Sequence, residues 1–378
     1  MRFQIAAISA LVAVVGVVSA AEATPQFARR YRVDCSHCHS APPRLNEQGF
    51  RFLAGGYRLE GVAPSATVPL AIWSTVDVER RHSIDLTKGF PSRVELISAG
   101  SLGESNIVYF AEWRALSQSI GGNRRLLNRS GRFEDLYVSI QLPGAFAATA
   151  GQFRGLAQVD VSQRLSLSEP LVFSSGLAGR RSPSSRLTSL RAFSPSGRQP
   201  AARFEYRTTT STAGEGWFAG ATLPLTGELT IPFTDAASFE LEGRPKGVFL
   251  EVYRRSGLTS VGGHSFLGDS ERRSLTGVVT HDLTNRVVIV AALGRFHVAG
   301  MADTRFSAGG EFTATQHLVG GLRVDHRTNL GRDPAVLLYG NVHLPFGPEA
   351  FRQAVRLQIE QRIEESNHIT AIALSHVF

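Results

Sequence analysis

The chain has 378 residues, more than the roughly 100 to 200 of an ordinary domain, so it can form two or three globular units or one large all-β body. Its 40 Lys+Arg and 32 Asp+Glu give a formal net charge of +8, and Lys88 and Lys246 are the only lysines, which excludes a Lys-rich tail for nucleic acid; no nucleic-acid partner is expected. The two cysteines, Cys35 and Cys38, exclude a multi-disulfide scaffold and a four-cysteine zinc site.

The first residues have the features of an export signal. A short positive start precedes a mainly apolar stretch, residues 5–18, and small-x-Ala cleavage patterns follow at 18–20 and 21–23. A transmembrane anchor is the alternative, but this stretch is shorter than the roughly 20 residues that a membrane-spanning helix needs. We therefore predict a signal peptide at residues 1–23 and a mature chain outside the cytoplasm.

Just after this segment stands Cys35-Ser36-His37-Cys38-His39, the C-x-x-C-H pattern of covalent heme attachment. Thiols at this spacing can reach both vinyl groups of a porphyrin, and the adjacent imidazole then meets the iron from one face. A thioredoxin-like redox couple, which needs a βαβ context that is absent here, and a short-loop disulfide are the alternatives. With an export signal ahead of it, the motif predicts one covalent heme c, bound by Cys35 and Cys38, with His39 as proximal ligand.

A helix is predicted directly after this motif. Prolines at its start, the periodic Leu45, Phe52 and Leu53, and Gly55 as terminator indicate one short helix over the heme face. The whole N-terminal module, residues 24–62, has too little core to be stable alone. We expect heme to supply part of the missing apolar contact and a neighbouring structure to supply the rest.

The segment from Pro25 to Tyr57 contains a further series of short motifs around Cys-x-x-Cys-His: Pro-x-Phe-Ala-Arg at 25–29, Pro-x-Leu-Asn at 43–46, Gly49, Phe52 and Gly56-Tyr57. With these motifs the segment resembles the fused cytochrome-porins of bacterial outer membranes, known best as the ferrous-iron oxidases of iron-oxidising bacteria. The resemblance implies that the heme module plugs or lines the mouth of a β-barrel, with Cys35 and Cys38 as thioether donors and His39 as axial ligand.

From residue 68 onward the dominant period is two, which predicts β-strands. In residues 352–363 the odd positions Val355, Leu357 and Ile359 are apolar and most even positions are polar, and residues 304–314 alternate in the same way. Such faces suit either a soluble β-sandwich or a membrane barrel. The mature chain has no apolar run long enough for a membrane helix, so a membrane protein of this sequence must be a closed barrel.

Connection lengths favour the barrel. Tight connections such as 104–105 and 143–144 alternate with longer ones such as 117–131 and 155–200, a pattern typical of periplasmic turns and external loops, although the later external loops are short. An even count of about 16 strands then places both chain ends on the periplasmic side. The predicted strands are 68–79, 94–103, 106–116, 132–142, 145–154, 201–209, 216–225, 246–255, 258–267, 272–283, 285–298, 303–314, 316–327, 335–344, 351–363 and 367–378.

The sequence thus predicts an all-β fold, an approximately 16-stranded outer-membrane β-barrel at residues 63–378 with a small N-terminal α-helical c-type heme module. The expected location is the outer membrane of a Gram-negative-type bacterium, with its lipid as a partner. Phe378 resembles the aromatic-terminated assembly signal of such barrels, although His376 stands where an aromatic residue is more usual.

Two features of the barrel interior are also predicted. The Ser- and Arg-rich residues 155–200 are too long for an idle turn, and we expect them to fold inward as a constriction, with an external lid as the alternative. Arginines on the polar strand faces are expected to pair with neighbouring acids rather than to form a dedicated anion path. The expected partners are Glu112, Asp135, Glu205, Glu251, Glu311 and Glu360.

These features predict an outer-membrane electron conduit. Its single heme accepts electrons from an extracellular donor, with Fe(II) as the first candidate, and passes them to a periplasmic c-type cytochrome or another soluble carrier. An iron product that precipitates near neutral pH must be made outside the cell, whereas the respiratory chain lies inside. Iron(II) oxidoreductase activity therefore stands as a hypothesis.

Three alternatives stay open: outward electron transfer to minerals or partners, a solute porin with a heme-bearing plug, and a soluble periplasmic cytochrome with a β-sandwich. The second axial ligand of the iron is not assigned. Met301, the only methionine of the mature chain, lies in an expected turn at 299–302, and the remaining histidines lie on predicted strands or loops.

Overall fold

A computed structural model gives the fold of the chain. The predicted signal peptide and the predicted assembly signal at Phe378 lie outside the described residues. The structure describes residues 25–41, 44–65, 69–81, 86–87, 93–120, 126–128, 130–155, 165–168, 170, 172–173, 198–209, 215–225, 247–268, 272–298, 301–315, 317–328, 334–346, 353–364 and 367–377.

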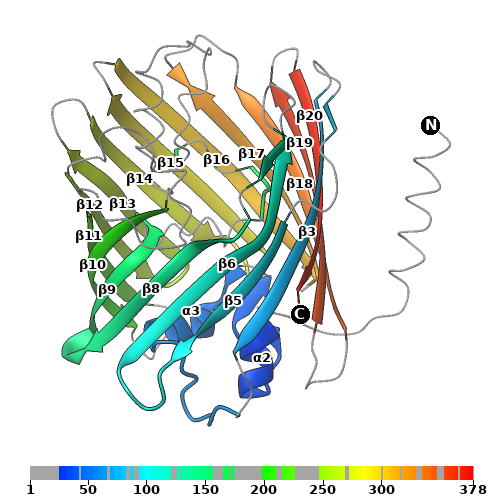
Figure 1. The fold of residues 1–378 in the computed structure, drawn as a ribbon. Helices are drawn as coiled ribbons and strands as arrows, with labels where there is room; N and C mark the ends of the chain where they lie inside the picture. Colours follow the sequence, from blue (N-terminus) through cyan, green and yellow to red (C-terminus); the bar gives the residue numbers. More distant parts are fainter. Residues whose placement is uncertain are drawn as a thin grey trace.

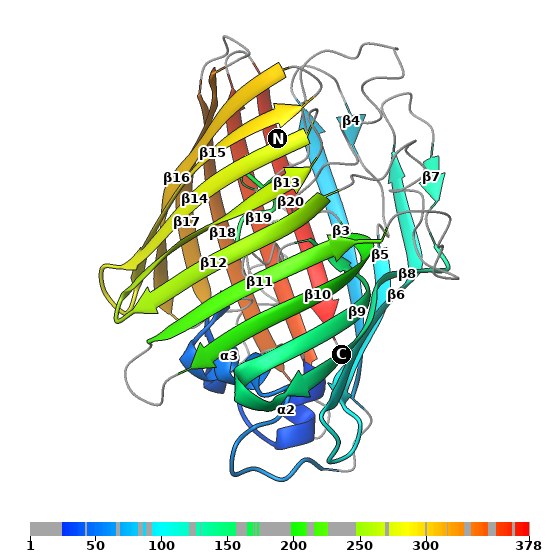
Figure 2. The same ribbon diagram turned by 90° about the vertical axis from the view of Figure 1, so that its left-hand side faces the viewer.

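The described strands form one closed antiparallel barrel (Figures 1 and 2). Sixteen long strands make its wall, and the first of them pairs with the last, so the sheet has no open edge. The wall strands are β3 (Leu70–Arg81), β5 (Arg93–Ser101), β6 (Ile107–Ile120), β8 (Arg132–Leu142), β9 (Phe146–Arg154), β10 (Arg198–Thr209), β11 (Gly216–Pro224), β12 (Gly247–Ser256), β13 (Thr259–Gly268), β14 (Arg272–Asp282), β15 (Val287–Val298), β16 (Met301–Thr315), β17 (Leu318–Arg327), β18 (Ala335–Phe346), β19 (Gln353–Glu364) and β20 (Asn367–Val377).

The predicted fold class and strand count are confirmed, and the strand bounds agree closely with the sequence pattern. Two short strands were not predicted, β4 (Leu86–Thr87) and β7 (Leu126–Asn128), which pair with the ends of β3 and β6. The expected turn at 299–302 is shorter than predicted, because Met301 already pairs with Val298 and begins β16.

The two faces of the strands have the opposite polarity to those of a soluble protein. Phe204 and Leu275, on the outer face, are 57% and 68% exposed, whereas Arg305 and Glu251, on the inner face, are each 2% exposed. An apolar exterior on a closed barrel is suited to lipid, which offers no hydrogen bonds to backbone or side chains. This arrangement contradicts the soluble β-sandwich, which would bury its apolar face.

The wall strands contain 9 to 15 residues, enough for the roughly 9 to 11 that a tilted strand needs to cross a bilayer. Strand number, closure and exterior together define an outer-membrane β-barrel, and the predicted outer-membrane location is confirmed.

Among the described residues, no helix is long and apolar enough to cross a membrane.

A small module precedes the barrel in sequence and lies at one of its ends (Figure 1). That end carries short connections between strands, such as 102–106 and 257–258, which in outer-membrane barrels face the periplasm. The module therefore lies at the periplasmic mouth. It contains α2 (Pro25–Tyr31), the 3-10 turn η1 (Cys35–His37), the hairpin β1 (His39–Ala41) and β2 (Arg44–Leu45), and α3 (Glu47–Ala54).

The polarity of the exterior predicts the effect of a charge placed on it. Leu293 is exposed on the outer face in the middle of β15, so Leu293→Arg should destabilise the membrane-inserted barrel by about 2 to 4 kcal/mol. Urea-dependent unfolding in lipid vesicles, followed by the gel mobility of the folded form, measures the change. Leu258→Arg is the matched control, because this equally exposed leucine lies in a periplasmic turn. Equal costs at the two positions would contradict a lipid-facing exterior.

Candidate heme-binding site

The C-x-x-C-H motif forms a single tight turn. η1 covers Cys35 to His37, and the Cys38 amide donates a hydrogen bond of 3.0 Å to the Cys35 carbonyl. Side chains three positions apart eclipse on a 3-10 turn, so the two cysteine side chains project from the same side of the backbone. No disulfide joins Cys35 and Cys38. His39 follows at once as the first residue of β1.

Asn46 fixes this turn to the helix that follows it. The Asn46 side-chain oxygen accepts a hydrogen bond from the Gly49 amide at 2.9 Å and so caps α3, while its Nδ2 donates to the carbonyls of Ser36 and His37, each at 3.1 Å. A Cβ atom at Gly49 would collide with the Cys38 carbonyl, so the close approach of helix and turn requires glycine. Sequence reasoning did not identify this clamp, although Asn at a helix start is a known N-cap signal.

The residues of the motif fit a covalently held heme. They place two cysteines on one side of a turn and an imidazole directly after it, which is the donor set of a c-type site. Burial raises the pKa of the Cys38 thiol to about 11, the opposite of the lowered pKa that a reactive thioredoxin-like couple needs.

The module packs against the inner wall through aromatic side chains. The rings of Phe27 and Phe52 meet edge to face with centroids 4.9 Å apart, and Phe27 stacks on Tyr57 at 5.2 Å. This cluster continues into Ala99 of β5 and Val108 of β6, so module and barrel share one hydrophobic core. The module therefore obtains from the barrel the apolar contact that its own size cannot provide.

A glycine allows the closest approach of module and wall. Gly56 has a φ of +68°, and a Cβ there would lie 2.6 Å from Cγ2 of Val108. The next residue, Tyr57, places its hydroxyl 3.2 Å from the hydroxyl of Tyr137 on β8. The Gly-Tyr pair is thus the point at which the chain leaves α3 and contacts β6 and β8.

The other side of the module reaches the far wall of the barrel. Arg44 of β2 forms an ion pair with Glu311 of β16, and Glu311 also accepts a hydrogen bond of 2.7 Å from the Tyr339 hydroxyl of β18. In the closed strand order β16 and β18 lie roughly across the barrel from β6 and β8. The module therefore bridges the periplasmic mouth (Figure 2). Glu311 was expected to pair along the sheet, and its partner in the module was not predicted.

The described parts of the long loop after β9 lie inside the barrel. The Leu165 carbonyl accepts hydrogen bonds from Asn341 at 2.6 Å and Gln358 at 3.2 Å, and Arg323 donates to the Ser166 hydroxyl at 2.7 Å. Farther along, Phe173 joins a buried cluster with side chains of β11 and β12. The predicted inward fold is therefore confirmed for residues 165–168 and 172–173.

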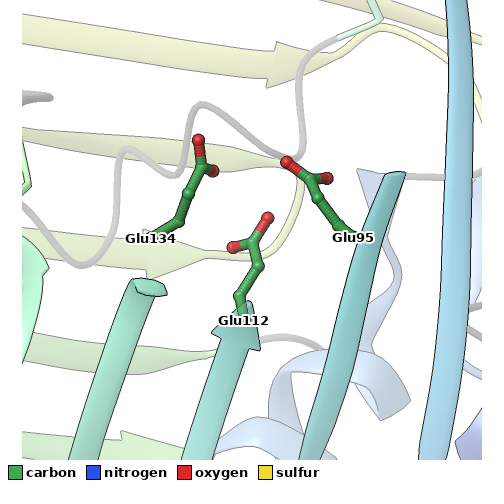
Figure 3. Close-up of side chains that lie close together, drawn as sticks. All are labelled: Glu95, Glu112 and Glu134. Carbon is green, nitrogen blue, oxygen red and sulfur yellow. The ribbon is translucent and has the colours of Figure 1, made fainter. Parts of the chain in front are cut away.

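Among the described residues, three carboxylates gather in the lumen, from Glu95, Glu112 and Glu134 on β5, β6 and β8 (Figure 3). One oxygen of each lies within 4.8 Å of the others, a spacing that a divalent cation could use. Arginines already balance these charges. Arg198 pairs with Glu112 at 3.1 Å and with Glu134 at 2.9 Å, and Arg114 and Arg93 pair with Glu134 and Glu95. We interpret the cluster as a salt-bridge network, as expected for the lumen arginines.

No protein-family model matches the sequence, and no curated protein matches it either. Solved structures with a similar fold include porins and other outer-membrane proteins. OmpF of Salmonella typhi in complex with daunomycin has a TM-score of 0.54 at 8% identity, covering 82% of this chain and 97% of that one. A triple mutant of the Rhodopseudomonas blastica porin has a TM-score of 0.52 at 8% identity, covering 82% and 100%.

These likenesses concern the fold alone, and they confirm the porin-like barrel fold that the sequence predicted. They agree with the solute-porin alternative better than with the electron conduit, and they carry no information on heme. The residues predicted to bind heme, Cys35, Cys38 and His39, are held close together by the turn.

The salt-bridge network makes Arg198 a sensitive position. Arg198 contacts Glu112, Glu134 and Asp135, so Arg198→Met would leave three inward carboxylates without their shared cation. We expect a loss of about 2 to 3 kcal/mol in unfolding free energy, less than the roughly 3 to 5 of a fully buried pair because Arg198 keeps 20% exposure. Urea titration of the vesicle-inserted protein measures it.

Arg255→Met provides the control, since the Arg255–Asp282 pair at 3.0 Å is more exposed and should contribute about 0 to 1 kcal/mol. Similar losses of unfolding free energy for both variants would contradict a special stabilising role of Arg198 in the carboxylate cluster.

Proposed function

We propose that the protein is an outer-membrane electron conduit, in which a single covalent heme c bound through Cys35, Cys38 and His39 accepts electrons from an extracellular donor and passes them to a periplasmic c-type cytochrome. Fe(II) is the first candidate donor, which makes the protein an iron(II) oxidoreductase. The observation that carries this proposal is the C-x-x-C-H turn held in the periplasmic mouth of a membrane-spanning barrel. Residues 24–62 are then the heme module and residues 63–378 the barrel.

Each part of the site has a role in this proposal. Cys35 and Cys38 would hold the porphyrin through thioether bonds, and His39 would donate an imidazole nitrogen to the iron. Bound heme supplies a one-electron couple whose potential depends on axial ligation and burial. Asn46 ties the turn to α3, so the backbone that carries Cys35, Cys38 and His39 is held against the rest of the module.

The anchoring contacts determine where this couple would stand. Tyr57 joins the module to Tyr137 on one wall, and Arg44 joins it to Glu311 on the other. In this proposal a soluble partner reaches the module from the periplasmic side, and a small donor reaches it from the extracellular side through the charged lumen. The barrel therefore brings donor and acceptor within reach of one site across a layer of hydrocarbon that is about 30 Å thick.

A solute porin with a heme-bearing plug is the second candidate. The porin fold of the neighbours and the inward loop at residues 165–168 favour it. In this function the module would stabilise or close the mouth, and its redox state would have no role in transport.

Loss of the thioether donors tests the proposal. The wild-type protein purified from outer membranes should keep a heme stain on a denaturing gel, because thioether bonds survive denaturation. The Cys35→Ala/Cys38→Ala variant should lose the stain, and Ser36→Ala, within the same turn, should keep it. Added Fe²⁺ should then reduce the oxidised wild-type heme, followed by visible absorbance.

A wild-type protein without stain would overturn the heme assignment. A stained protein that Fe²⁺ leaves oxidised at every accessible pH would remove the iron-oxidase function. If, in addition, the bilayer conductance of the double-cysteine variant equalled that of the wild type, the solute porin would be the better function.

A further inference from the structure

A c-type heme used for electron transfer commonly has a second axial ligand, either methionine or histidine. Met301 is remote from the module. It begins β16, and Glu311, the residue of that strand that the module contacts, lies ten positions further along. At about 3.3 Å per residue this places Met301 on the order of 33 Å away along the strand.

The histidines divide clearly by position. His264 lies in the buried cluster around Phe173, away from the module. His281 contacts Thr259, and His376 contacts Gln353, both on outer-face positions of their strands. At the other end of the barrel lie His297, His326 and His368. Among the described residues outside the heme motif, this leaves His343 and His317 near the periplasmic mouth.

His343 faces the lumen near the periplasmic end of β18. Alternate residues of this strand, Leu337, Asn341 and His343, are buried on the inner face, whereas Leu338 is exposed on the outer face. His343 is 7% exposed, and its backbone amide donates a hydrogen bond of 2.8 Å to the carbonyl of His317 in the neighbouring turn. The imidazole is therefore enclosed at the end of the barrel that holds the module.

The hairpin of β1 and β2, which begins at His39, contacts this same part of the wall. His39 pairs with Leu45, and the adjacent Arg44 reaches Glu311, which in turn bonds Tyr339 of β18. Tyr339 and His343 lie on one face of that strand, about 13 Å apart along it. The imidazole that follows the cysteines and the imidazole of the wall thus share one corner of the mouth.

We propose that His343 is the second axial ligand of the heme iron, opposite His39, so that the barrel wall completes the heme site. This inference rests on the proposed heme. It has a structural consequence: the attached heme would add a direct link between the module and β18 to the Arg44–Glu311 and Glu311–Tyr339 contacts. It also has a redox consequence, because two imidazole ligands give a lower potential than a His/Met pair.

Spectroscopy of the purified, heme-loaded protein tests the assignment without any assay of activity. Electron paramagnetic resonance of the ferric wild type should show a low-spin, six-coordinate iron. His343→Ala should convert it to high spin, and added imidazole should restore low spin. His343→Met should stay low spin with a raised midpoint potential. His317→Ala, the nearest rival, and His376→Ala, an outer-face histidine at the same end, should leave the wild-type spectrum unchanged.

The outcomes separate the two proposals. Wild-type protein without a covalent heme stain removes the heme function itself. Stained protein whose low-spin spectrum survives His343→Ala, or is lost with His317→Ala instead, overturns only the role of His343, as does a wild type that is already high spin. Should His343→Ala fail to fold, His343→Met decides, because an unchanged midpoint potential would exclude position 343 as a ligand.

Discussion

The structure depends on strands in which apolar and polar side chains alternate, with the apolar side chains facing outward and the polar ones inward, the reverse of a soluble protein. Because lipid cannot hydrogen-bond to the backbone, the strands must close on themselves, and because lipid surrounds the closed sheet, their apolar side chains must point outward. Phe204 and Leu275 lie outside, and Arg305 and Glu251 lie inside. One consequence is a lumen crowded with charge, in which every ionised group needs a partner.

Those partners come from three sources: the wall itself, the inward loop and the N-terminal module. Arg198 balances carboxylates of neighbouring strands, Ser168 of the loop donates to Glu360, and Arg44 of the module pairs with Glu311. The module consequently does not sit on the barrel as a separate domain. It shares a hydrophobic core with β5 and β6 and contributes to the charge balance of β16. A small N-terminal module that lacks a core of its own obtains one from the barrel.

The alternation, which is local, allowed the barrel to be predicted from sequence almost strand by strand. Residues 352–363 alternate visibly, and β19 lies there with its apolar positions outward.

Contacts between distant segments were not predictable. Nothing local marks Glu311 as the partner of Arg44, or Tyr137 as the partner of Tyr57, because tertiary packing brings these residues together. The contacts of Asn46 were predictable only in part. Its role as a helix N-cap can be recognised in the sequence, whereas its hydrogen bonds to Ser36 and His37 depend on the fold of the turn. The C-x-x-C-H motif predicts heme attachment, a property that cannot be inferred from the barrel fold alone.

In the proposed function, electrons cross the envelope through a heme fixed in this barrel. The decisive measurement uses sealed vesicles that carry the protein and enclose oxidised cytochrome c, with Fe²⁺ added outside. The Cys35→Ala/Cys38→Ala variant controls for Fe²⁺ that leaks through the same barrel. Faster reduction of the enclosed cytochrome c with the wild type than with the variant is the predicted result. Equal rates for the two proteins would contradict the account and leave a barrel that only admits solutes.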